Sequence, residues 1–452
     1  MRVLLISANR LTSPYPVYPI GLDYVRRAVG QRHEAAVLDA ALPRAPERLA
    51  AEIARFEPQL LGIALRNIDS TGGSNGVSAL EGYRALVRQV RAHTAAPIVL
   101  GGSGFTIAPR QYLAALGADY GIVGEGERLA ALADALEAGA GGVRDLPGVV
   151  AAAGTGEVIM PEPWRGSFER SFDESCDHVG YYLRRGGMLN LQTKRGCPYR
   201  CVYCTYPWIE GRRLRLFEPA EVARTALALQ EAGAAFIFVT DASFNVRQEH
   251  TIAVAQALRA AGVTVPWGGF FAPLTTSPDY FRALAECGLS HVEFGTESLS
   301  RRVLQGLQKP FSPETALASH EAALAAGLKV AHYLMFGGPG ETEETVAETC
   351  GRAAKLRECV CFFYTGVRIF PHTPLYDLAR QEGQLTAEPD PLEPVFYQPA
   401  GLPLARLDEL VERATAGRPS WIAGSKLQKT AAILERLYAR GHVGPLWERL
   451  IG

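Results

Sequence analysis

Two series of alternating strand-like and helix-like stretches run along this chain, and they limit its fold more than any other feature. From residue 2 to about 138, short apolar, β-branched runs alternate with amphipathic stretches. The predicted strands are "RVLLIS", "AAVLDA", "LLGIAL", "PIVLGG" and "YGIVGE". Several are apolar throughout, which is typical of parallel strands covered by helices on both faces. The pattern predicts a doubly wound α/β domain, Rossmann or flavodoxin-like, over residues 1–140.

The second series begins after residues 141–187, where the βα rhythm is lost and breakers such as "AAAGTGE" and "PEPWRG" predict a linker. Its strands are predicted at 188–193, 235–240, 264–271, 291–296, 329–337 and 362–370. Six βα units are fewer than the eight that close a complete barrel, so residues 188–385 are expected to form an open, partial (β/α)6 barrel. Residues 386–452 are Pro-rich and then helical, and are expected to form a small, mainly helical region that closes one end.

Charge and hydropathy exclude two classes of partner. The 452 residues include 46 basic and 47 acidic side chains, so the chain has no electrostatic footprint for nucleic acid. No apolar run approaches the roughly 18 residues that span a bilayer, and the N-terminal apolar run is too short for a signal peptide. We therefore expect a cytoplasmic protein that acts on a small molecule, without nucleic acid and without an integral membrane segment.

Three of the eight cysteines stand close together in "KRGCPYRCVYCTYP", residues 194–207. Clustered thiols in a reducing compartment favour metal binding over disulfides. A structural zinc site normally has four protein ligands, whereas this triplet stands alone, and the other five cysteines are expected to be small buried residues. A cubane 4Fe-4S cluster held by three thiolates leaves one iron open for a substrate or cofactor.

The CxxxCxxC spacing, directly after the first strand of a βα series, resembles that of the radical S-adenosylmethionine (radical SAM) superfamily. The resemblance implies that Cys197, Cys201 and Cys204 bind a 4Fe-4S cluster and that SAM chelates the open iron. It also implies reductive cleavage of SAM to a 5'-deoxyadenosyl radical, with electrons from a donor such as flavodoxin or ferredoxin. Zinc or adventitious metal is the alternative.

Further segments at the strand ends resemble SAM-binding elements of the same superfamily. "FVTDASFN" is a degenerate match to a "GGE"-like segment, with a helix cap as the alternative role for its aspartate. "VEFGTES" and "FGGPGET" match segments that approach SAM through polar side chains and through backbone free of bulk. An aromatic residue inside the cysteine motif and an isoleucine on the sixth strand are expected beside the adenine, with loop or core packing as alternatives. The implied SAM contacts are Tyr203, Asp241, Glu297, Ser298, Gly337, Gly338, Pro339 and Ile369.

The first domain resembles the cobalamin-binding domain of the B12-dependent radical SAM enzymes, through "VLGGSGF", "YGIVGEGE" and its place before the barrel. Its glycines follow the fourth strand rather than the first, so they are not the dinucleotide fingerprint. The DxHxxG motif of histidine-coordinated cobalamin is absent and the first histidine is His33, so the cobalt is expected to lack a protein histidine ligand. A charged loop and an Asx turn are the alternatives for Arg66 and Asn67. The implied cobalamin contacts are Asn9, Arg66, Asn67, Gly101, Gly102, Ser103, Glu125 and Gly126.

This resemblance implies a cobalamin-dependent enzyme that methylates an unactivated carbon of a small-molecule, natural-product or lipid-like substrate through methylcobalamin and the 5'-deoxyadenosyl radical. Cyclisation or rearrangement without methyl transfer is the alternative. Methylthiotransfer is disfavoured because residues 1–175 contain no cysteine for a second cluster, and a non-catalytic carrier would not need both domains.

No catalytic acid or base can be named from the sequence. Five residues of the third and fifth barrel strands are candidates for the substrate-facing interior, where alternate members should point inward, with core packing as the alternative. They are Phe270, Phe271, His332, Tyr333 and Met335.

Overall fold

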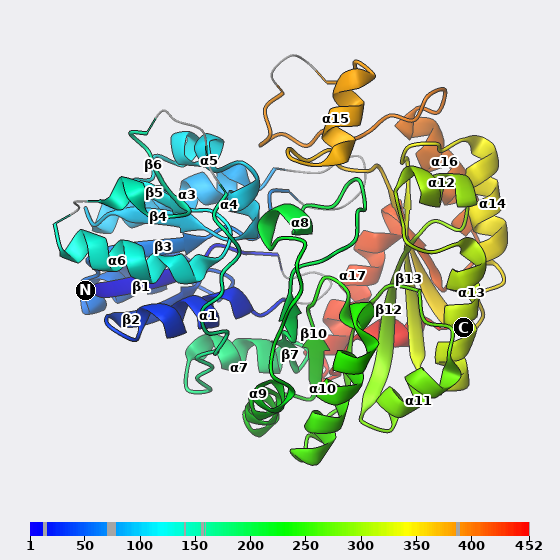
Figure 1. The fold of residues 1–452 in the computed structure, drawn as a ribbon, viewed down its shortest axis with the longest axis horizontal. Coiled ribbons are helices and arrows are strands. Elements are labelled where there is room, and N and C mark those ends of the chain that lie inside the picture. Colours follow the sequence, from blue (N-terminus) through cyan, green and yellow to red (C-terminus); the bar gives the residue numbers. More distant parts are fainter. Residues whose placement is uncertain are drawn as a thin grey trace.

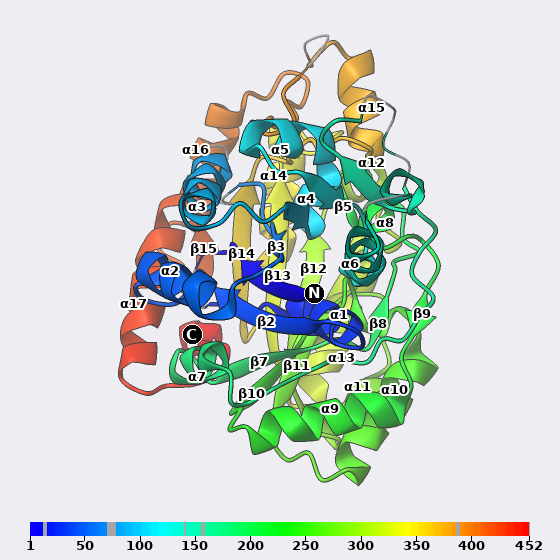
Figure 2. The same ribbon diagram turned by 90° about the vertical axis from the view of Figure 1, so that its left-hand side faces the viewer.

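The computed structural model describes residues 1–11, 16–69, 78–139, 142–154, 158, 160–385 and 389–451. Within these ranges the chain forms two large sheets that lie beside each other, each with its own layer of helices (Figure 1). In the view turned by 90°, the half with the first sheet lies in front of the half with the second sheet (Figure 2). Among the described residues, no helix has both the length and the apolar character needed to cross a membrane.

The first sheet has the strand order β2-β1-β3-β4-β5-β6, which reverses between β1 and β3 as in flavodoxin-like folds. The five predicted parallel strands are β1 (Arg2–Ser7), β2 (Glu34–Asp39), β3 (Leu60–Ala64), β4 (Ile98–Gly101) and β5 (Tyr120–Ile122). The sixth, β6 (Val149–Ala151), pairs antiparallel with β5. Helices α1 (Ile20–Val29), α2 (Ala45–Phe56), α3 (Leu80–His93), α4 (Ser103–Ile107), α5 (Pro109–Leu116) and α6 (Leu129–Glu137) flank the sheet.

The second sheet has seven parallel strands in the order β15-β14-β13-β12-β11-β10-β7. The six predicted strands are β7 (Met188–Leu191), β10 (Phe236–Val239), β11 (Trp267–Phe271), β12 (Leu289–Glu297), β13 (Lys329–Phe336) and β14 (Cys359–Thr365). The seventh, β15 (Trp421–Ala423), comes from the C-terminal region. Helices α9 (Pro219–Glu231), α10 (Gln248–Ala260), α11 (Pro278–Ala285), α13 (Pro313–Ala325), α14 (Glu343–Ala353) and α16 (Leu404–Thr415) follow the strands.

Shorter elements connect and close these layers. Helix α7 (Asp177–Arg184) precedes the second sheet, and the small ribbon of β8 (Lys194–Arg195) and β9 (Arg215–Leu216) encloses the cysteine motif and α8 (Tyr206–Ile209). Helices α12 (Arg301–Gly306), α15 (Pro374–Gln381) and α17 (Gly424–Ala439) and a 3-10 helix (Leu446–Leu450) complete the second half. The C-terminal region is thus mainly helical, as predicted, and also lends one strand to the barrel sheet.

The two faces of the barrel sheet separate the candidates for the interior as strand alternation requires. Phe271 belongs to the large core beneath the outer helices, whereas its neighbour Phe270 is 37% exposed on the inner face. Tyr333 packs on the inner face in a cluster with Phe362 and Trp447. His332, between Tyr333 and Ala331, therefore points the other way.

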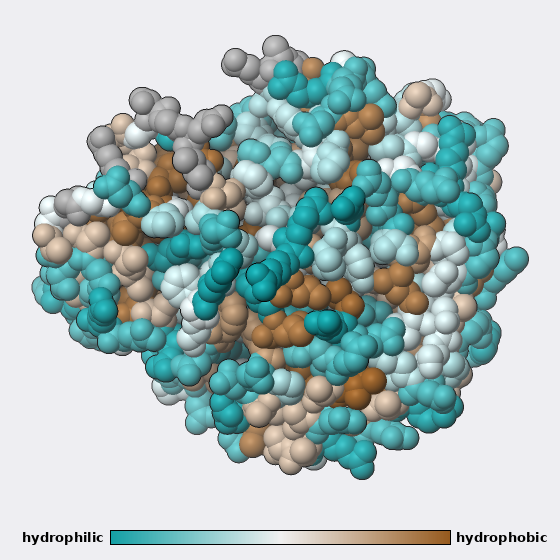
Figure 3. All heavy atoms as spheres, viewed as in Figure 1, coloured by the Kyte–Doolittle hydropathy of each residue, from teal (hydrophilic) through white to brown (hydrophobic). Residues whose placement is uncertain are grey.

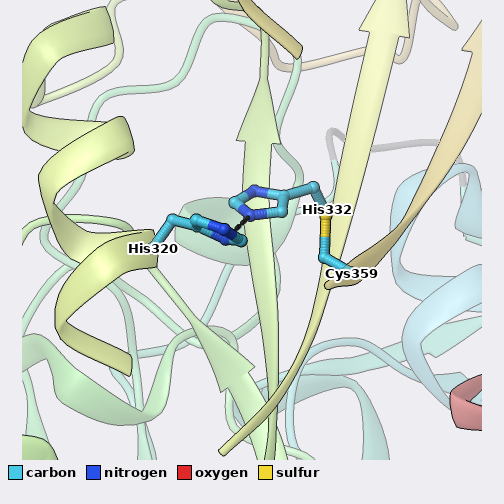
Figure 4. Close-up of side chains that lie close together, drawn as sticks. All are labelled: His320, His332 and Cys359. Carbon is cyan, nitrogen blue, oxygen red and sulfur yellow. Dashed lines mark hydrogen bonds between the residues drawn. The ribbon is translucent and has the colours of Figure 1, made fainter. Parts of the chain in front are cut away.

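His332 meets His320 of α13 in the layer between sheet and helices (Figure 4). His320 Nδ1 lies 3.0 Å from His332 Nε2, and His332 Nδ1 lies 2.8 Å from the Thr296 hydroxyl. Burial lowers the pKa of His320 to about 4 and that of His332 well below its ordinary value. Both rings are therefore neutral at neutral pH, and His332 is no contact for a substrate in the barrel.

The 3-10 helix Leu446–Leu450 covers the lower part of the inner face. Its Trp447 Nε1 donates a hydrogen bond of 2.9 Å to Glu293 Oε1, and the Tyr333 hydroxyl donates one of 2.8 Å to Oε2 of the same carboxyl group. Burial raises the pKa of Glu293 to about 7. The barrel therefore has a closed floor in which a single carboxyl group holds two aromatic side chains.

Candidate active site between the two sheets

The cysteine loop is fixed by backbone contacts on both sides. Gly196, with φ of +84°, has no room for a Cβ, which would lie 2.3 Å from the Arg213 carbonyl oxygen. The Val202 N–H donates to the Leu307 carbonyl oxygen at 3.1 Å, which ties the loop to the end of α12. Val202 and Leu307 also belong to one apolar cluster with Tyr203, Met335 and other residues of the upper barrel. The loop thus has a rigid apolar support at the carboxyl ends of the strands.

The three cysteines of the motif bring their thiols near one another in one buried or half-buried loop. Burial raises the pKa of Cys201, and that of Cys204 to about 12, so thiolates here need a bound cation. Cys197 and Cys201 are also close enough to Cys204 for their charges to raise its pKa. That the three thiolates bind a 4Fe-4S cluster stays a prediction.

Glu297 is the polar centre beside the cysteine loop. Its Oε1 accepts hydrogen bonds from the Tyr203 hydroxyl and from Lys309 Nζ, the latter at 2.9 Å. Its Oε2 is buried and has no hydrogen-bond partner. The residue has φ of +55° at a register shift at the end of β12, a strained conformation of the kind found at functional sites. Tyr203 and Glu297 thus lie together beside the cysteine loop, and their contacts with SAM stay predictions.

Lys309 was not predicted from the sequence. Burial lowers the pKa of Lys309, and the nearby Glu297 carboxylate raises it. The net effect is a pKa above the ordinary value of lysine. The lysine is therefore a buried cation next to two cysteines of the motif. "GLQKPF" carries no motif that would have singled it out, because the contact depends on how α12 ends over the cysteine loop.

Asp241 is fixed at the ends of β7 and β10. Its Oδ1 accepts from the Thr193 N–H at 2.9 Å and its Oδ2 from the Thr193 hydroxyl at 2.6 Å. Lys194 Nζ lies 4.0 Å from Oδ2. The alternative role as a helix cap is not observed, since the next short helix begins after Ser243. Asp241 therefore joins two strand ends, and any contact with SAM stays a prediction.

Other predicted SAM contacts are engaged by protein groups. The Ser298 hydroxyl lies 3.0 Å from that of Thr349 and accepts from the Ser300 N–H, so it stabilises the turn after β12. A Cβ on Gly338 would lie 2.9 Å from the Leu307 side chain, which places the Gly337–Gly338–Pro339 loop against the support of the cysteine loop. The missing side chain of Gly338 therefore allows this loop to pack closely against Leu307, which is a contact within the protein.

Ile369 was predicted to lie on the sixth barrel strand. That strand is β14, which ends at Thr365, so Ile369 lies in the segment after it. Glycine at 366 ends the strand with φ of +88°. Ile369 instead lines a cavity of about 680 Å³ between the two halves, with Ile107 of α4 and Trp208 of α8. The Trp208 ring stacks on His372 at a centroid distance of 3.9 Å.

In the first sheet, the predicted glycines serve mainly to let two strand ends meet. Gly102 has φ of +96°, and a Cβ there would lie 2.7 Å from the Leu65 carbonyl oxygen. Gly101 has room for a Cβ, whose nearest neighbour would be 3.9 Å away. The Ser103 hydroxyl donates to the Arg66 carbonyl oxygen at 3.0 Å.

The remaining cobalamin candidates surround the same edge. Asn9 accepts from the Leu11 N–H in an Asx turn, and the Asn67 carbonyl oxygen accepts from the Tyr83 hydroxyl. A Cβ on Gly126 would lie 2.7 Å from the Val25 side chain. Asn9, Asn67 and Gly126 therefore help to build the edge, and Arg66 is exposed on it.

Glu125 is bound to the other half of the chain. Arg195 Nη1 lies 2.9 Å and Arg215 Nη1 2.6 Å from its Oε1, and Arg195 Nη2 lies 2.6 Å from Glu127 Oε1. Arg195 also lies over the Tyr24 ring at 4.8 Å. The charged side chains are at most 11% exposed, so these are buried ion pairs. Arg195 stands two positions before Cys197, and the network therefore joins the cysteine loop to the end of β5.

Two further contacts join the carboxyl ends of the two sheets. Trp208 Nε1 donates to the Thr106 carbonyl oxygen at 3.2 Å, and Arg368 Nε donates to Asp69 Oδ2 at 2.8 Å. Thr106 and Asp69 follow β4 and β3, whereas Trp208 and Arg368 follow the cysteine loop and β14. The ligand-binding edge of the first sheet thus faces the cysteine loop across a common boundary.

The comparisons with known families match this arrangement. The family model described as "Radical SAM superfamily" matches residues 191–353, and the one described as "B12 binding domain" matches residues 6–133. The chain thus carries a B12 binding domain followed by a radical SAM domain.

Relatives of the chain include the tryptophan 2-C-methyltransferase of Streptomyces laurentii, which is 25% identical over 445 residues, covering 82% of this chain and 73% of that protein. An uncharacterized methyltransferase of Pyrococcus horikoshii is 25% identical over 372 residues, covering 80% and 78%. The solved structure of the radical SAM methyltransferase TsrM from Kitasatospora setae, with tryptophan substrate and the SAM analogue aza-SAM bound, has a TM-score of 0.86 and 24% identity over 100% of this chain and 98% of that chain. The whole chain therefore shares the fold of TsrM.

Proposed function

We propose that this radical SAM enzyme methylates an unactivated carbon of a small, ring-bearing substrate. It would use a 4Fe-4S cluster on Cys197, Cys201 and Cys204, SAM and cobalamin. When bound, these groups supply one-electron chemistry and methyl-group transfer. The protein's own residues hold them facing one another and exclude water.

The observation that carries the proposal is the boundary between the sheets. The cysteine loop lies directly opposite the ligand edge of the B12 binding domain, and Arg195 links the two through Glu125 and Glu127. A methyl group passed from one cofactor to a substrate activated by the other requires this juxtaposition. A carrier of one cofactor would not.

The residues beside the cysteine loop fit SAM. Glu297 Oε2 is a buried acceptor without a partner, which suits an ammonium or hydroxyl donor of SAM. Lys309 donates a hydrogen bond to Oε1 of the same carboxyl group, so it holds that carboxyl group in place. Tyr203 and Ile369 share the apolar cluster under the loop and would pack against the adenine.

The inner face of the barrel supplies the substrate side. The rings of Tyr333 and Tyr364 stack at 14° with centroids 6.3 Å apart, and Phe270 meets Tyr333 at 6.2 Å. Since Trp447 closes the floor, the aromatic space has a limited depth. This lining favours a small ring-bearing molecule over a long-chain lipid.

Three further features belong to the same proposal. The cobalt would lack a protein histidine ligand, because the first domain has no DxHxxG motif and its first histidine, His33, is held 3.0 Å from the Met1 amino group and 3.0 Å from Asp134, away from the ligand edge. Electrons would come from a donor such as flavodoxin or ferredoxin. The enzyme would act in the cytoplasm.

The test is a purification without oxygen from cells supplied with hydroxocobalamin, followed by assays of iron, corrinoid and SAM cleavage. We expect a cluster and about one corrinoid per chain, as the three-thiolate motif and the second domain require. A Cys201→Ala variant should lose the cluster and SAM cleavage but keep corrinoid. Retained cleavage would refute the radical SAM chemistry, and a cluster without corrinoid would refute the methylation.

Substrate and reaction type are then tested together with SAM carrying a deuterated methyl group and a panel of aromatic molecules. Tryptophan comes first, because the relative from Streptomyces laurentii is named for it. A labelled methylated product establishes methyl transfer. A product without the label would favour cyclisation or rearrangement.

A further inference from the structure

Three metal-ligand side chains meet in the barrel sheet's outer layer, far from the strand ends that form the cofactor boundary. His320 of α13, His332 of β13 and Cys359 of β14 place their donor atoms within 4.8 Å of one another (Figure 4). All three residues are buried. None of the three belongs to the CxxxCxxC motif, and none has a role in the proposed reaction.

Their chemistry is that of a zinc site. Two neutral imidazoles and a thiol are the nitrogen and sulfur donors that zinc prefers. The distance of 3.0 Å between His320 Nδ1 and His332 Nε2 is close to the edge of about 3.3 Å that two nitrogens bound to one tetrahedral zinc would span. Only a small movement of one ring would be needed.

Cys361 offers a fourth ligand. Its Sγ lies 3.9 Å from Cys359 Sγ, which matches the roughly 3.8 Å between two thiolates on one zinc. Its backbone pairs with His332 across β13 and β14. Two imidazoles and two thiolates around Zn²⁺ form a neutral complex, and a neutral complex suits a dry layer between sheet and helix.

The outer ring nitrogen of His332 has the kind of partner that a metal-bound histidine normally has. His332 Nδ1 lies 2.8 Å from the Thr296 hydroxyl, which orients the ring. His320 Nε2 is buried and has no hydrogen-bond partner among the described residues. A hydrogen-bonded pair of neutral histidines accounts for the ring contact alone, whereas a metal accounts for the rings and the thiols together.

We propose that His320, His332, Cys359 and Cys361 bind a structural zinc ion that joins α13 to β13 and β14. The four ligands are buried and would complete a tetrahedral shell, so the ion would be structural rather than catalytic. It would stabilise the two strands whose ends carry the Gly337–Gly338–Pro339 loop and Ile369.

The experiment uses the enzyme with its cluster and cobalamin, incubated with Zn²⁺ and desalted. Zinc and iron per chain are measured by mass spectrometry, and the zinc environment by X-ray absorption at the zinc edge, which iron and cobalt do not obscure. We expect about one zinc per chain, with nitrogen near 2.0–2.1 Å and sulfur near 2.3 Å. His320→Gln and Cys359→Ser should lose the zinc and keep the iron.

Cys287→Ser is the matched control, since Cys287 is a buried cysteine elsewhere in the same layer and should leave zinc content unchanged. No bound zinc, zinc retained in both variants, or a zinc shell of sulfur alone would each overturn the proposal. Sulfur alone would indicate zinc in the cysteine loop. If the variants fail to fold, the spectrum of the unaltered enzyme still decides, because among the described residues the group of three metal-ligand side chains at this site combines imidazole with thiolate.

Discussion

Some residues at the boundary between the two sheets have a structural role in addition to any contact with a ligand. Gly102 is the clearest case, because its positive φ and the nearby Leu65 carbonyl oxygen leave no space for a side chain. The neighbouring Gly101 is free of both restrictions. The strand ends that bind the ligand must first pack on one another, and Gly102 makes that packing possible.

A Gly102→Ala variant should be less stable than the unaltered enzyme by roughly 1–3 kcal/mol, because it combines a strained φ with a backbone clash. Gly101→Ala is the control and should unfold at nearly the same temperature. Thermal unfolding and corrinoid content are measured on both. If Gly102→Ala unfolds normally yet loses corrinoid, the glycine lines the ligand directly, as the sequence resemblance implies.

The sequence singled out the residues that lie in motifs, and it could not single out a neighbour that depends on packing. Tyr203 and Glu297 lie together because the cysteine loop and the end of β12 meet at the carboxyl edge of the sheet. Lys309 reaches Glu297 because α12 ends above the loop, and no local pattern encodes that contact. The Ser298 hydroxyl contacts Thr349 and Ser300, and its contact with SAM stays a prediction, as do those of Tyr203 and Glu297.

Among the elements, the strands of the two βα series were predictable and the strands added at the sheet edges were not. The predicted parallel strands are all present, because continuous apolar runs identify buried strands. β6 lies in the segment predicted as a linker and pairs antiparallel with β5, and β15 joins β14 from the region predicted as helical. The C-terminal region was predicted to close one end, and the 3-10 helix Leu446–Leu450 is the part that covers the barrel floor.

That floor makes stability depend on pH. Burial raises the pKa of Glu293 to about 7, against 4.5 in the unfolded chain. Between these values the unfolded chain releases the proton first, so this group's contribution to stability falls as pH rises from about 4.5 to 7 and is constant above that window. The loss is on the order of 1–3 kcal/mol.

A Glu293→Gln variant, which resembles the protonated carboxyl group, should lack this loss. Urea unfolding at pH 5 and pH 8 measures the difference between the two proteins. The unaltered enzyme should lose stability relative to the variant as pH rises. Parallel pH dependences would contradict the assignment. Glu341, whose pKa burial also raises to about 7, remains in both proteins and therefore cancels.

At the scale of the whole molecule, buried ion pairs hold the two sheets together. Arg195 is the central group, because one side chain bridges Glu125 and Glu127 of the first half from a position next to the cluster cysteines. By contrast, the charged and other hydrophilic residues on the face shown in Figure 3 are interspersed with hydrophobic ones over both halves, where they are exposed to water. A pair that is buried and geometrically specific fixes relative position more firmly than exposed charges do.

Arg195→Gln should therefore reduce the methylated product formed per SAM cleaved more than it reduces the iron and corrinoid content. Glu127 loses its buried cation, whereas Glu125 keeps Arg215, so we expect a loss of stability of up to about 3–5 kcal/mol that Glu127→Gln partly restores. Arg27→Gln, which removes an exposed pair with Glu169, is the control and should cost no more than about 1 kcal/mol. Iron and corrinoid per chain should stay near normal in both variants. The decisive measurement is the amount of methylated product formed per SAM cleaved. If Arg195 sets the separation of the two cofactors, this ratio falls in Arg195→Gln and not in Arg27→Gln. If the bridge only stabilises the fold, Arg195→Gln lowers the amount of active enzyme and leaves the ratio unchanged.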